Sequence, residues 1–310
     1  MRKCSRWTAS GTLNGGRWRR QALAGAVLGL SSLALSPGSL AGPRDFPGET
    51  HDATLLRYRE ILGHVVVVPV RLNGQGPFDL ALDTAATFTT LEPGLAAELG
   101  LTPLGPAATV TIAGARLSAR ARLERVQFGA VEVSGVEVRC AEITALRSAD
   151  RRIRGILGQS ALARVSFGLD HARGLVLFAP PGRTDAVVPL DEREDRPAVT
   201  LELRRSGVAL SLVLDSGLSV PVLFEKLGTP LAVERVAGGF FQAETNSGSA
   251  RLSMAHLEGR VGLLRIPSTL AAVQDDSAAG GRQEDGLLPT RLFRIVYFDR
   301  AGKQLLLQGR

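Results

Sequence analysis

Two short stretches of this chain place an acidic residue in the same setting, and this pairing limits the possible folds more than any other feature. LALDTAATFTT contains Asp83, and LVLDSGLSVPV contains Asp215, 132 residues later. In each, an apolar, strand-like run ends in the aspartate, and a hydroxyl residue and a small residue follow. Burying an acid at the end of an apolar strand is costly unless the acid is compensated. Two acids in matched settings therefore indicate a shared purpose.

The sequence around the acids is written twice. VPVRLNGQGPFDLALDTA and VTLELRRSGVALSLVLDSG each predict a strand, a turn with glycine and a second strand that ends in the acid. A glycine and two apolar residues come later in each half. Ile156 lies 73 residues after Asp83, and Leu287 lies 72 residues after Asp215. Such an internal repeat predicts two similar lobes.

Short alternating runs separated by turn residues predict an all-β fold with a few short helices. ATVTIAGARLSARARLERVQF is typical of a hairpin, with its turn at Ala113 and Gly114. After each acid, a helix-like stretch is expected: EPGLAAELGL in the first half and LFEKLG in the second.

Two similar lobes packed about a pseudo-two-fold axis would bring Asp83 and Asp215 face to face. Two carboxyls at hydrogen-bonding distance cannot both ionise cheaply, so they share a proton. One ionised and one protonated carboxyl can activate a water and protonate a leaving amine. The acids therefore predict hydrolysis of a peptide bond without a covalent intermediate or a metal.

The residues that follow the acids suit this chemistry. The hydroxyls of Thr84 and Ser216 can bond across the lobe interface and hold the two loops together. The small residues Ala85 and Gly217 let the backbone pass close to the carboxylates and direct N–H groups at them.

These motifs resemble those of retropepsin- and pepsin-like aspartic proteases, in a bacterial single-chain form with two lobes. Asp83-Thr84-Ala85 and Asp215-Ser216-Gly217 fall on the family's Asp-Thr/Ser-Gly motif, and Ile156-Leu157-Gly158 and Leu287-Leu288-Pro289 fall on its later apolar-apolar-Gly segment. The resemblance implies two homologous β-barrel lobes, an aspartic endopeptidase and a monomer with a pseudo-dimeric site. It also implies a flap at Ala113 and Gly114, with AGGFFQAETNSG as a weaker candidate in the second lobe.

Three positions depart from the family pattern: Ala85 and Pro289 stand where glycine is usual, and Leu218 where a small residue is common. A degenerate module that binds extended peptides without cleaving them is therefore an alternative function. A structural duplication with the acids as buried hydrogen-bond anchors is a third. A Ser-His-Asp hydrolase stays open as well, although no G-x-S-x-G motif supports it.

The N-terminus predicts export. Residues 1–41 contain six basic residues and no acid, with a basic region before a largely apolar run and small residues before a plausible cut after Ala41. The apolar run is shorter than a membrane-spanning helix needs. Arg19-Arg20 resembles a twin-arginine signal, with an ordinary secretory signal and an uncleaved membrane anchor as the alternatives. We expect a periplasmic protein, with no membrane contact beyond this segment.

The predicted domains follow from these features. We expect an export signal over 1–41, a lead-in over 42–62, the N-terminal lobe over 63–182, a linker over 183–198 and the C-terminal lobe over 199–310. The charge run from Asp191 to Arg196 is interpreted as a solvated connector.

The composition argues against several other partners. The net charge of +7 comes mostly from residues 1–41, since the remainder holds 31 basic and 30 acidic residues. No basic stripe interleaved with aromatics indicates nucleic-acid binding. No cysteine and histidine cluster has metal-ligand spacing. We therefore expect no cofactor, no metal and no nucleic acid, with a peptide or protein as the substrate.

Overall fold

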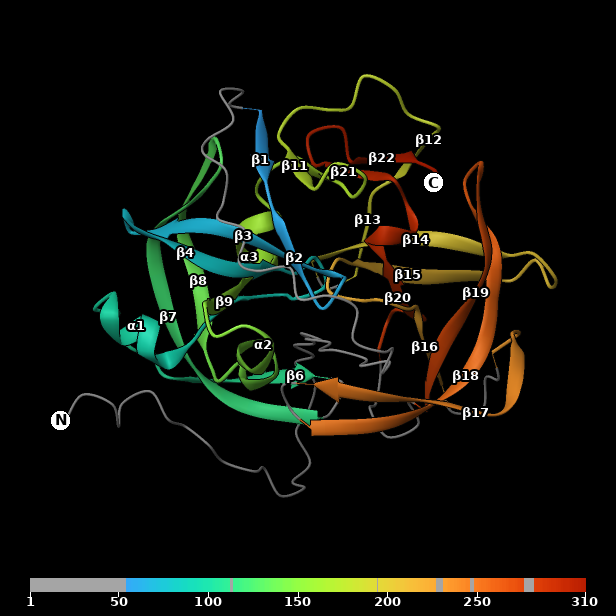
Figure 1. Cartoon of the computed structure of the whole chain (residues 1–310), viewed down its shortest axis with the longest axis horizontal. Coiled ribbons are helices and arrows are strands. Elements are labelled where there is room, and N and C mark those ends of the chain that lie inside the picture. The colour runs from blue at the N-terminus through green and yellow to red at the C-terminus, as the bar shows by residue number, and fades with distance from the viewer. Residues whose placement is uncertain (1–53, 112–113, 194, 227–230, 246–247, 276–281) are drawn as a thin grey trace, which may run out of the picture.

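A computed structural model describes residues 54–310, except 112–113, 194, 227–230, 246–247 and 276–281. The predicted export signal and the start of the lead-in lie outside the described residues. Strands dominate and form three sheets. Figure 1 shows one lobe in blue to green, a second in yellow to red, and strands of both along the top edge. The predicted all-β, two-lobed fold class is confirmed.

The N-terminal lobe is built on an eight-stranded sheet with the order β2-β3-β4-β9-β5-β8-β7-β6. Its strands are β2 (Arg59–Ile61), β3 (Val65–Leu72), β4 (Gln75–Leu82), β5 (Thr89–Leu91), β6 (Pro106–Thr111), β7 (Gly114–Phe128), β8 (Val131–Cys140) and β9 (Ile153–Leu157).

The C-terminal lobe repeats this arrangement with the order β13-β14-β15-β20-β16-β19-β18-β17. Each position matches one in the first sheet, and the additional pairing of β14 with β18 matches that of β3 with β7. Its strands are β13 (Asp191–Arg193), β14 (Arg196–Leu203), β15 (Ala209–Asp215), β16 (Val222–Glu225), β17 (Glu234–Thr245), β18 (Gly248–Val261), β19 (Leu264–Asp275) and β20 (Gly286–Pro289).

A six-stranded sheet, ordered β1-β11-β10-β21-β22-β12, joins the lobes. Three strands come from each half, and β10 pairs with β21 at the centre, where Phe167 lies opposite Phe298. Its strands are β1 (Leu55–Arg57), β10 (Phe167–Asp170), β11 (Leu175–Leu177), β12 (Ala186–Pro189), β21 (Ile295–Asp299) and β22 (Gln304–Gln308).

Side-chain alternation sorts the strands that lead to the acids between two cores. On β15, Leu212 and Leu214 face the main apolar core, which runs through both lobes. Val213, between them, faces a smaller apolar cluster. On β4, Ala81 likewise faces away from the main core into a separate cluster. Because successive side chains alternate, the acids at the strand ends lie on the side of these two smaller clusters.

The helices are short: α1 (Pro93–Glu98), α2 (Thr144–Ala149), α3 (Gln159–Leu162) and a 3-10 turn, η2 (Thr290–Leu292). Pro93 at the first turn of α1 suits a helix start, so the helix expected after the first acid is confirmed. The helix expected at LFEKLG is wrong, because Val222–Glu225 form β16. Pairing with β20 and β19 decides this segment against its local preference.

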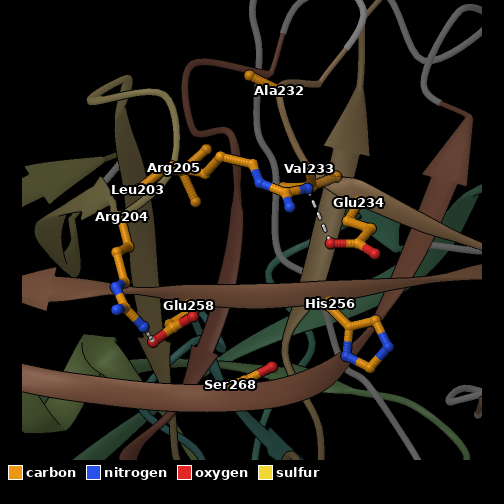
Figure 2. A pocket seen from close by; sticks show the side chains of 9 residues that line it. All are labelled: Leu203, Arg204, Arg205, Ala232, Val233, Glu234, His256, Glu258 and Ser268. Carbon is orange, nitrogen blue, oxygen red and sulfur yellow. Dashed lines mark hydrogen bonds and ion pairs between the residues drawn. The ribbon is translucent and has the colours of Figure 1, made fainter.

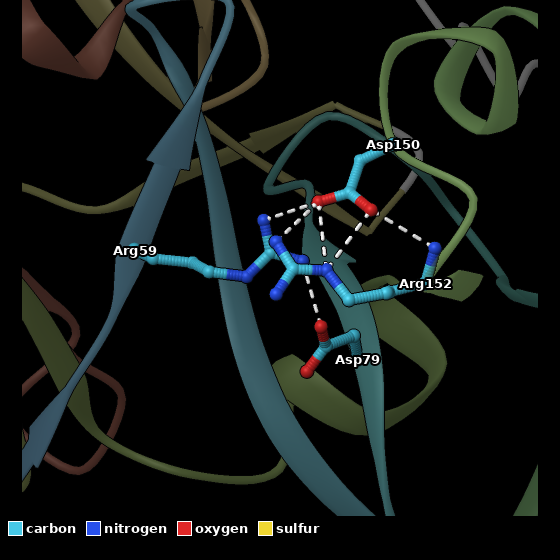
Figure 3. A network of polar contacts seen from close by, with 4 residues as sticks. All are labelled: Arg59, Asp79, Asp150 and Arg152. Atoms are coloured by element: carbon cyan, nitrogen blue, oxygen red, sulfur yellow. Dashed lines mark hydrogen bonds and ion pairs between the residues drawn. The ribbon is translucent and has the colours of Figure 1, made fainter. Parts of the chain in front are cut away.

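Both segments expected outside the lobes contribute strands. The described end of the lead-in forms β1 and β2, and the linker forms β12, β13 and the start of β14. Arg59 of β2 binds Asp79 of β4 at 2.6 Å and Asp150, after α2, at 2.7 Å (Figure 3). The guanidinium of Arg152 adds a contact to Asp150 at 2.9 Å. The ion pairs fasten β2 to the lobe. In the part of the chain that the structure describes, no helix is long and apolar enough to span a membrane.

Candidate active site

Both predicted acids follow buried strands at the same place in their lobes. Asp83 comes directly after β4, and Asp215 is the last residue of β15. Each strand has a parallel neighbour, β9 or β20, and the N–H of Asp83 donates to the carbonyl of Leu157 at 3.0 Å. Parallel pairing on one side and antiparallel pairing on the other fix where each acid-bearing loop begins.

Four hydrogen bonds tie the two loops to each other. The hydroxyl of Thr84 donates to the carbonyl of Leu214 at 2.7 Å and accepts from the N–H of Ser216 at 3.0 Å. The hydroxyl of Ser216 donates to the carbonyl of Leu82 at 2.8 Å and accepts from the N–H of Thr84 at 3.1 Å. All four bonds are buried. The bonds expected across the lobe interface are therefore present. They hold the two loops that carry the acids next to each other.

Backbone N–H groups hold one oxygen of each carboxyl. Oδ1 of Asp83 accepts from Ala85 at 2.9 Å and from Ala86 at 3.0 Å. Oδ1 of Asp215 accepts from Gly217 at 2.7 Å. Oδ2 of Asp215 is buried and has no hydrogen-bond partner among the described residues. An unsatisfied buried carboxyl oxygen is unusual in a folded protein.

Burial sets the ionisation of both carboxyls. Asp83 is 6% exposed and Asp215 is 1% exposed. Burial raises the pKa of Asp83 to about 6, against the lowering effect of its two backbone donors and of the Arg196 charge. Burial also raises the pKa of Asp215 well above its ordinary value, and the negative charge of Asp83 raises it further. The two acids therefore act on each other electrostatically, as a proton-sharing pair must.

Comparison with protein families gave a match over residues 68–161, to the family described as aspartyl protease. This part of the chain is similar to the aspartyl protease family. The resemblance to retropepsin- and pepsin-like proteases is thereby confirmed, and the match supports an aspartic-protease-like function of the hydrolase type. A comparison with curated proteins gave no match. The matched segment contains Asp83 and ends before the C-terminal lobe, which has the same sheet order as the N-terminal lobe.

The alanine in the first aspartyl protease motif is unstrained. Ala85 is not among the described non-glycine residues with positive φ, so its side chain costs no backbone strain. It is fully buried and keeps the N–H that bonds Asp83. Leu218, in the second motif, is buried in the apolar cluster beside the acid, together with Phe241 and Leu252 of the β17–β18 hairpin. This side of the site is filled by the protein's own side chains.

The two later apolar segments, Ile156-Leu157-Gly158 and Leu287-Leu288-Pro289, pair beside the strands that lead to the acids and are called the crossing segments. They differ at their last residue. A side chain at Gly158 would lie 2.6 Å from the carbonyl oxygen of Phe88 and 2.7 Å from that of Ala86, so only glycine fits. Pro289 takes the equivalent place in the second lobe with φ −59°, an ordinary value for proline, opposite Asp215 in the parallel ladder. The second crossing thus accommodates a residue that the first would exclude.

Both lobes carry a long hairpin at equivalent positions in their sheets, and the hairpin of the N-terminal lobe includes the predicted flap. β6 and β7 pair up to Thr111 and Gly114, and β17 and β18 pair up to Thr245 and Gly248. Figure 1 shows both hairpins along the bottom of the molecule, each reaching toward the other lobe. Ala113, one of the two predicted flap residues, lies outside the described residues, and Gly114 is the first residue of β7.

Two supporting features were not predicted. Gln159 donates to the carbonyl of Thr84 at 2.6 Å and accepts from Arg300 at 2.8 Å. These bonds support the loop that carries Asp83. Arg196 is fully buried and pairs with the equally buried Glu284. The interpretation of the charge run as a solvated connector is therefore wrong at Arg196. Aligning the two halves would have signalled it, since Arg196 takes the place of the apolar Val65.

One hollow among the described residues lies apart from the acid pair. The described residues contain no group of three or more histidine, cysteine or acidic side chains that could hold a metal. A hollow of about 690 Å³ lies between the turn after β14 and strands β17 to β19. Figure 2 shows that ion pairs line it, Arg204 with Glu258 and Arg205 with Glu234. None of its lining residues belongs to the predicted site.

Proposed function

We propose that the protein is an aspartic endopeptidase in which Asp83 and Asp215 together activate a water against a peptide bond. The observation that carries this proposal is the set of four buried hydrogen bonds between Thr84, Ser216 and the strands that end in the acids. Each of these bonds joins one lobe to the other, so none of them can form within a single lobe. They keep two buried carboxyls opposite each other at the cost of desolvating both.

The proposed reaction needs one proton on the pair. The ionised carboxyl takes a proton from the water as its oxygen attacks the peptide carbon, and the protonated carboxyl donates its proton to the carbonyl oxygen. In the second step, one carboxyl protonates the amide nitrogen and the other accepts a hydroxyl proton as the C–N bond breaks. The products are a carboxylic acid and an amine, and the pair regains its single proton.

This chemistry requires a bell-shaped dependence of activity on pH. Activity is lost at low pH, when both carboxyls are protonated, and at high pH, when both are ionised. Because burial raises the pKa of both acids, with that of Asp83 at about 6, the singly protonated pair extends to higher pH than it would in water.

The test is cleavage of a mixed peptide library between pH 3 and pH 8, with products identified by mass spectrometry. Asp83→Asn and Asp215→Asn are each expected to abolish cleavage. Asp170→Asn is a matched control, because Asp170 is also buried and its Oδ1 also accepts two backbone N–H bonds, but it ends strand β10 in the sheet that joins the lobes. Cleavage retained by either site variant would refute the mechanism.

Binding without cleavage is the second candidate function. The burial of Leu218 beside Asp215, under the β17–β18 hairpin, favours it, because protein side chains fill space that a substrate side chain would need. In that case wild-type protein would bind library peptides and leave them intact. Leu218→Ala would then be expected to open the site and increase cleavage.

We further propose that the protein acts outside the cytoplasm as a monomer. The basic, apolar and small-residue order of residues 1–41 supports export. One chain supplies both acids, so the site needs no second copy. Fractionation of cells expressing the full chain, followed by sedimentation of the exported form, tests both points. Retention in the cytoplasm would refute the first, and activity confined to a dimer would refute the second.

A further inference from the structure

Arg196 and Glu284 form an ion pair in which both side chains are fully buried. Nη2 of Arg196 lies 3.1 Å from Oε1 of Glu284, and Nε donates to the carbonyl of Arg193 at 3.1 Å. Taking two charges out of water costs several kcal/mol each, and their attraction seldom returns more than it costs. A pair of this kind is therefore a poor way to stabilise a fold.

The register of the sheet places Arg196 across from an active-site acid. In the antiparallel pair of β14 and β15, Ala198 lies opposite Val213. Continuing that register by two residues puts Arg196 opposite Asp215. Side chains at opposed positions share one face of the sheet. Ala198 and Val213 both face the smaller apolar cluster of this lobe, so Arg196 and Asp215 lie on the same face as that cluster.

The N-terminal lobe has an uncharged residue at the equivalent position. There Val67 lies opposite Ala81, and the same continuation puts Val65 opposite Asp83. Val65 is buried in an apolar cluster. Since a valine serves in one copy of the repeat, the fold does not require a charged residue at this place.

The charge of Arg196 acts on both acids. It lowers the pKa of Asp83 and that of Asp215, against the effect of burial. Two further cations lie close to Glu284 and its neighbour Asp285. Arg282 approaches Oε1 of Glu284 at 3.8 Å, and the neighbouring Asp285 is engaged by Lys226 at 2.7 Å.

We propose that Arg196 is a positioning residue that keeps one negative charge on the Asp83–Asp215 pair, and that Glu284 holds its guanidinium in place. The proposal rests on the proposed proteolytic function. The charge of Arg196 matters because the acid pair is buried. Burial alone would favour the protonated form of both carboxyls, and no base would then be left to accept a proton from the water.

The test compares two variants that change the ion pair in different ways. Arg196→Met/Glu284→Met removes both charges of the pair, and the nearly buried Arg282 keeps its charge but loses its contact with Glu284. Since the cation dominates at the acids, both limbs of the pH–activity profile are expected to move up by about one pH unit. Glu284→Gln keeps the cation without its partner, and its profile is expected to stay in place or move down. A profile unchanged in the double variant, or an upward shift in both, would overturn the proposal.

A control separates this effect from loss of stability. Arg59→Met/Asp79→Asn removes an ion pair that lies on the other lobe and is expected to leave the pH profile unchanged. A second readout does not depend on cleavage: carbon-13 NMR titration of labelled aspartate carboxyls, assigned with Asp83→Asn and Asp215→Asn. If wild type cleaves nothing, the proteolytic function fails, yet this titration still decides whether Arg196 lowers the pKa of the pair. Identical titrations in wild type and the double variant would refute its role.

Discussion

The loops at Asp83 and Asp215 occupy equivalent places in a repeated fold but are supported differently. Asp83 receives two backbone hydrogen bonds and lies opposite Val65, whereas Asp215 receives one within the described residues and lies opposite Arg196. One loop compensates its buried acid with backbone donors, and the other adds a buried cation. The comparison teaches that the two copies diverged in how they support an acid and did not diverge in the acid itself.

The largest expected effect tests whether this difference matters to the chemistry. If the acids act as one pair, Asp83→Asn and Asp215→Asn should lower kcat to the same floor, a loss of about 100- to 10,000-fold, despite their different surroundings. The double variant should lose no more than either single variant, since the pair works as a unit. Steady-state kinetics on one cleaved peptide measure this. A clearly smaller loss for one acid would show that the loops are unequal in function too.

The same variants should change stability in the opposite direction. The folded-state pKa of each acid is raised, so its contribution to stability is fully present below pH 3.8 and is lost as pH rises through the folded value, about 6 for Asp83. A neutral asparagine suffers no such loss. Asp83→Asn should therefore be more stable than wild type at pH 7, and this advantage should shrink at pH 3. Urea unfolding at the two pH values measures the difference.

The hydroxyls test the symmetry of the lobe contact. Thr84→Val and Ser216→Ala each leave a buried N–H and a buried carbonyl without their hydroxyl partner, which costs about 1–3 kcal/mol of unfolding free energy. Equal losses would mean that both loops carry the interface alike. Thr84→Ser keeps the hydroxyl and is the control. A double variant whose loss is the simple sum would contradict a shared network.

The crossing segments give a smaller contrast between the lobes. Gly158→Ala forces a methyl against two carbonyl oxygens and should cost about 1–3 kcal/mol. Pro289→Ala adds no such contact. It should lower the unfolding free energy by less than about 1 kcal/mol, because alanine gives the unfolded chain more freedom than proline. Gly182→Ala is the control, because no atom lies within 4 Å of the added methyl. Thermal unfolding of the three variants decides whether the crossings are constrained differently.

Local patterns were enough to predict the acids and the bonds between their loops. A strand, an acid and a hydroxyl residue recur at one spacing, and equivalent residues must meet at a pseudo-two-fold axis. Patterns failed where distant pairing decides the structure. LFEKLG has helix-forming residues, but β16 lies between two other strands, so Phe224 and Leu223 face opposite cores. Arg196 was missed because it ends a polar run, and its equivalence to the buried Val65 appears only when the two halves are aligned residue by residue.

The smallest expected effect concerns the first motif, where alanine replaces the glycine that the second motif retains. Because Ala85 has no positive φ, the loop gains nothing from glycine there. Ala85→Gly should lower the unfolding free energy by about 0.4–1 kcal/mol, since glycine gives the unfolded chain more conformations to lose. It should leave kcat unchanged, because the N–H bond to Asp83 depends on the backbone alone. An increase in kcat would show that the alanine restrains the first loop, and the two copies would then differ in activity as well as in support.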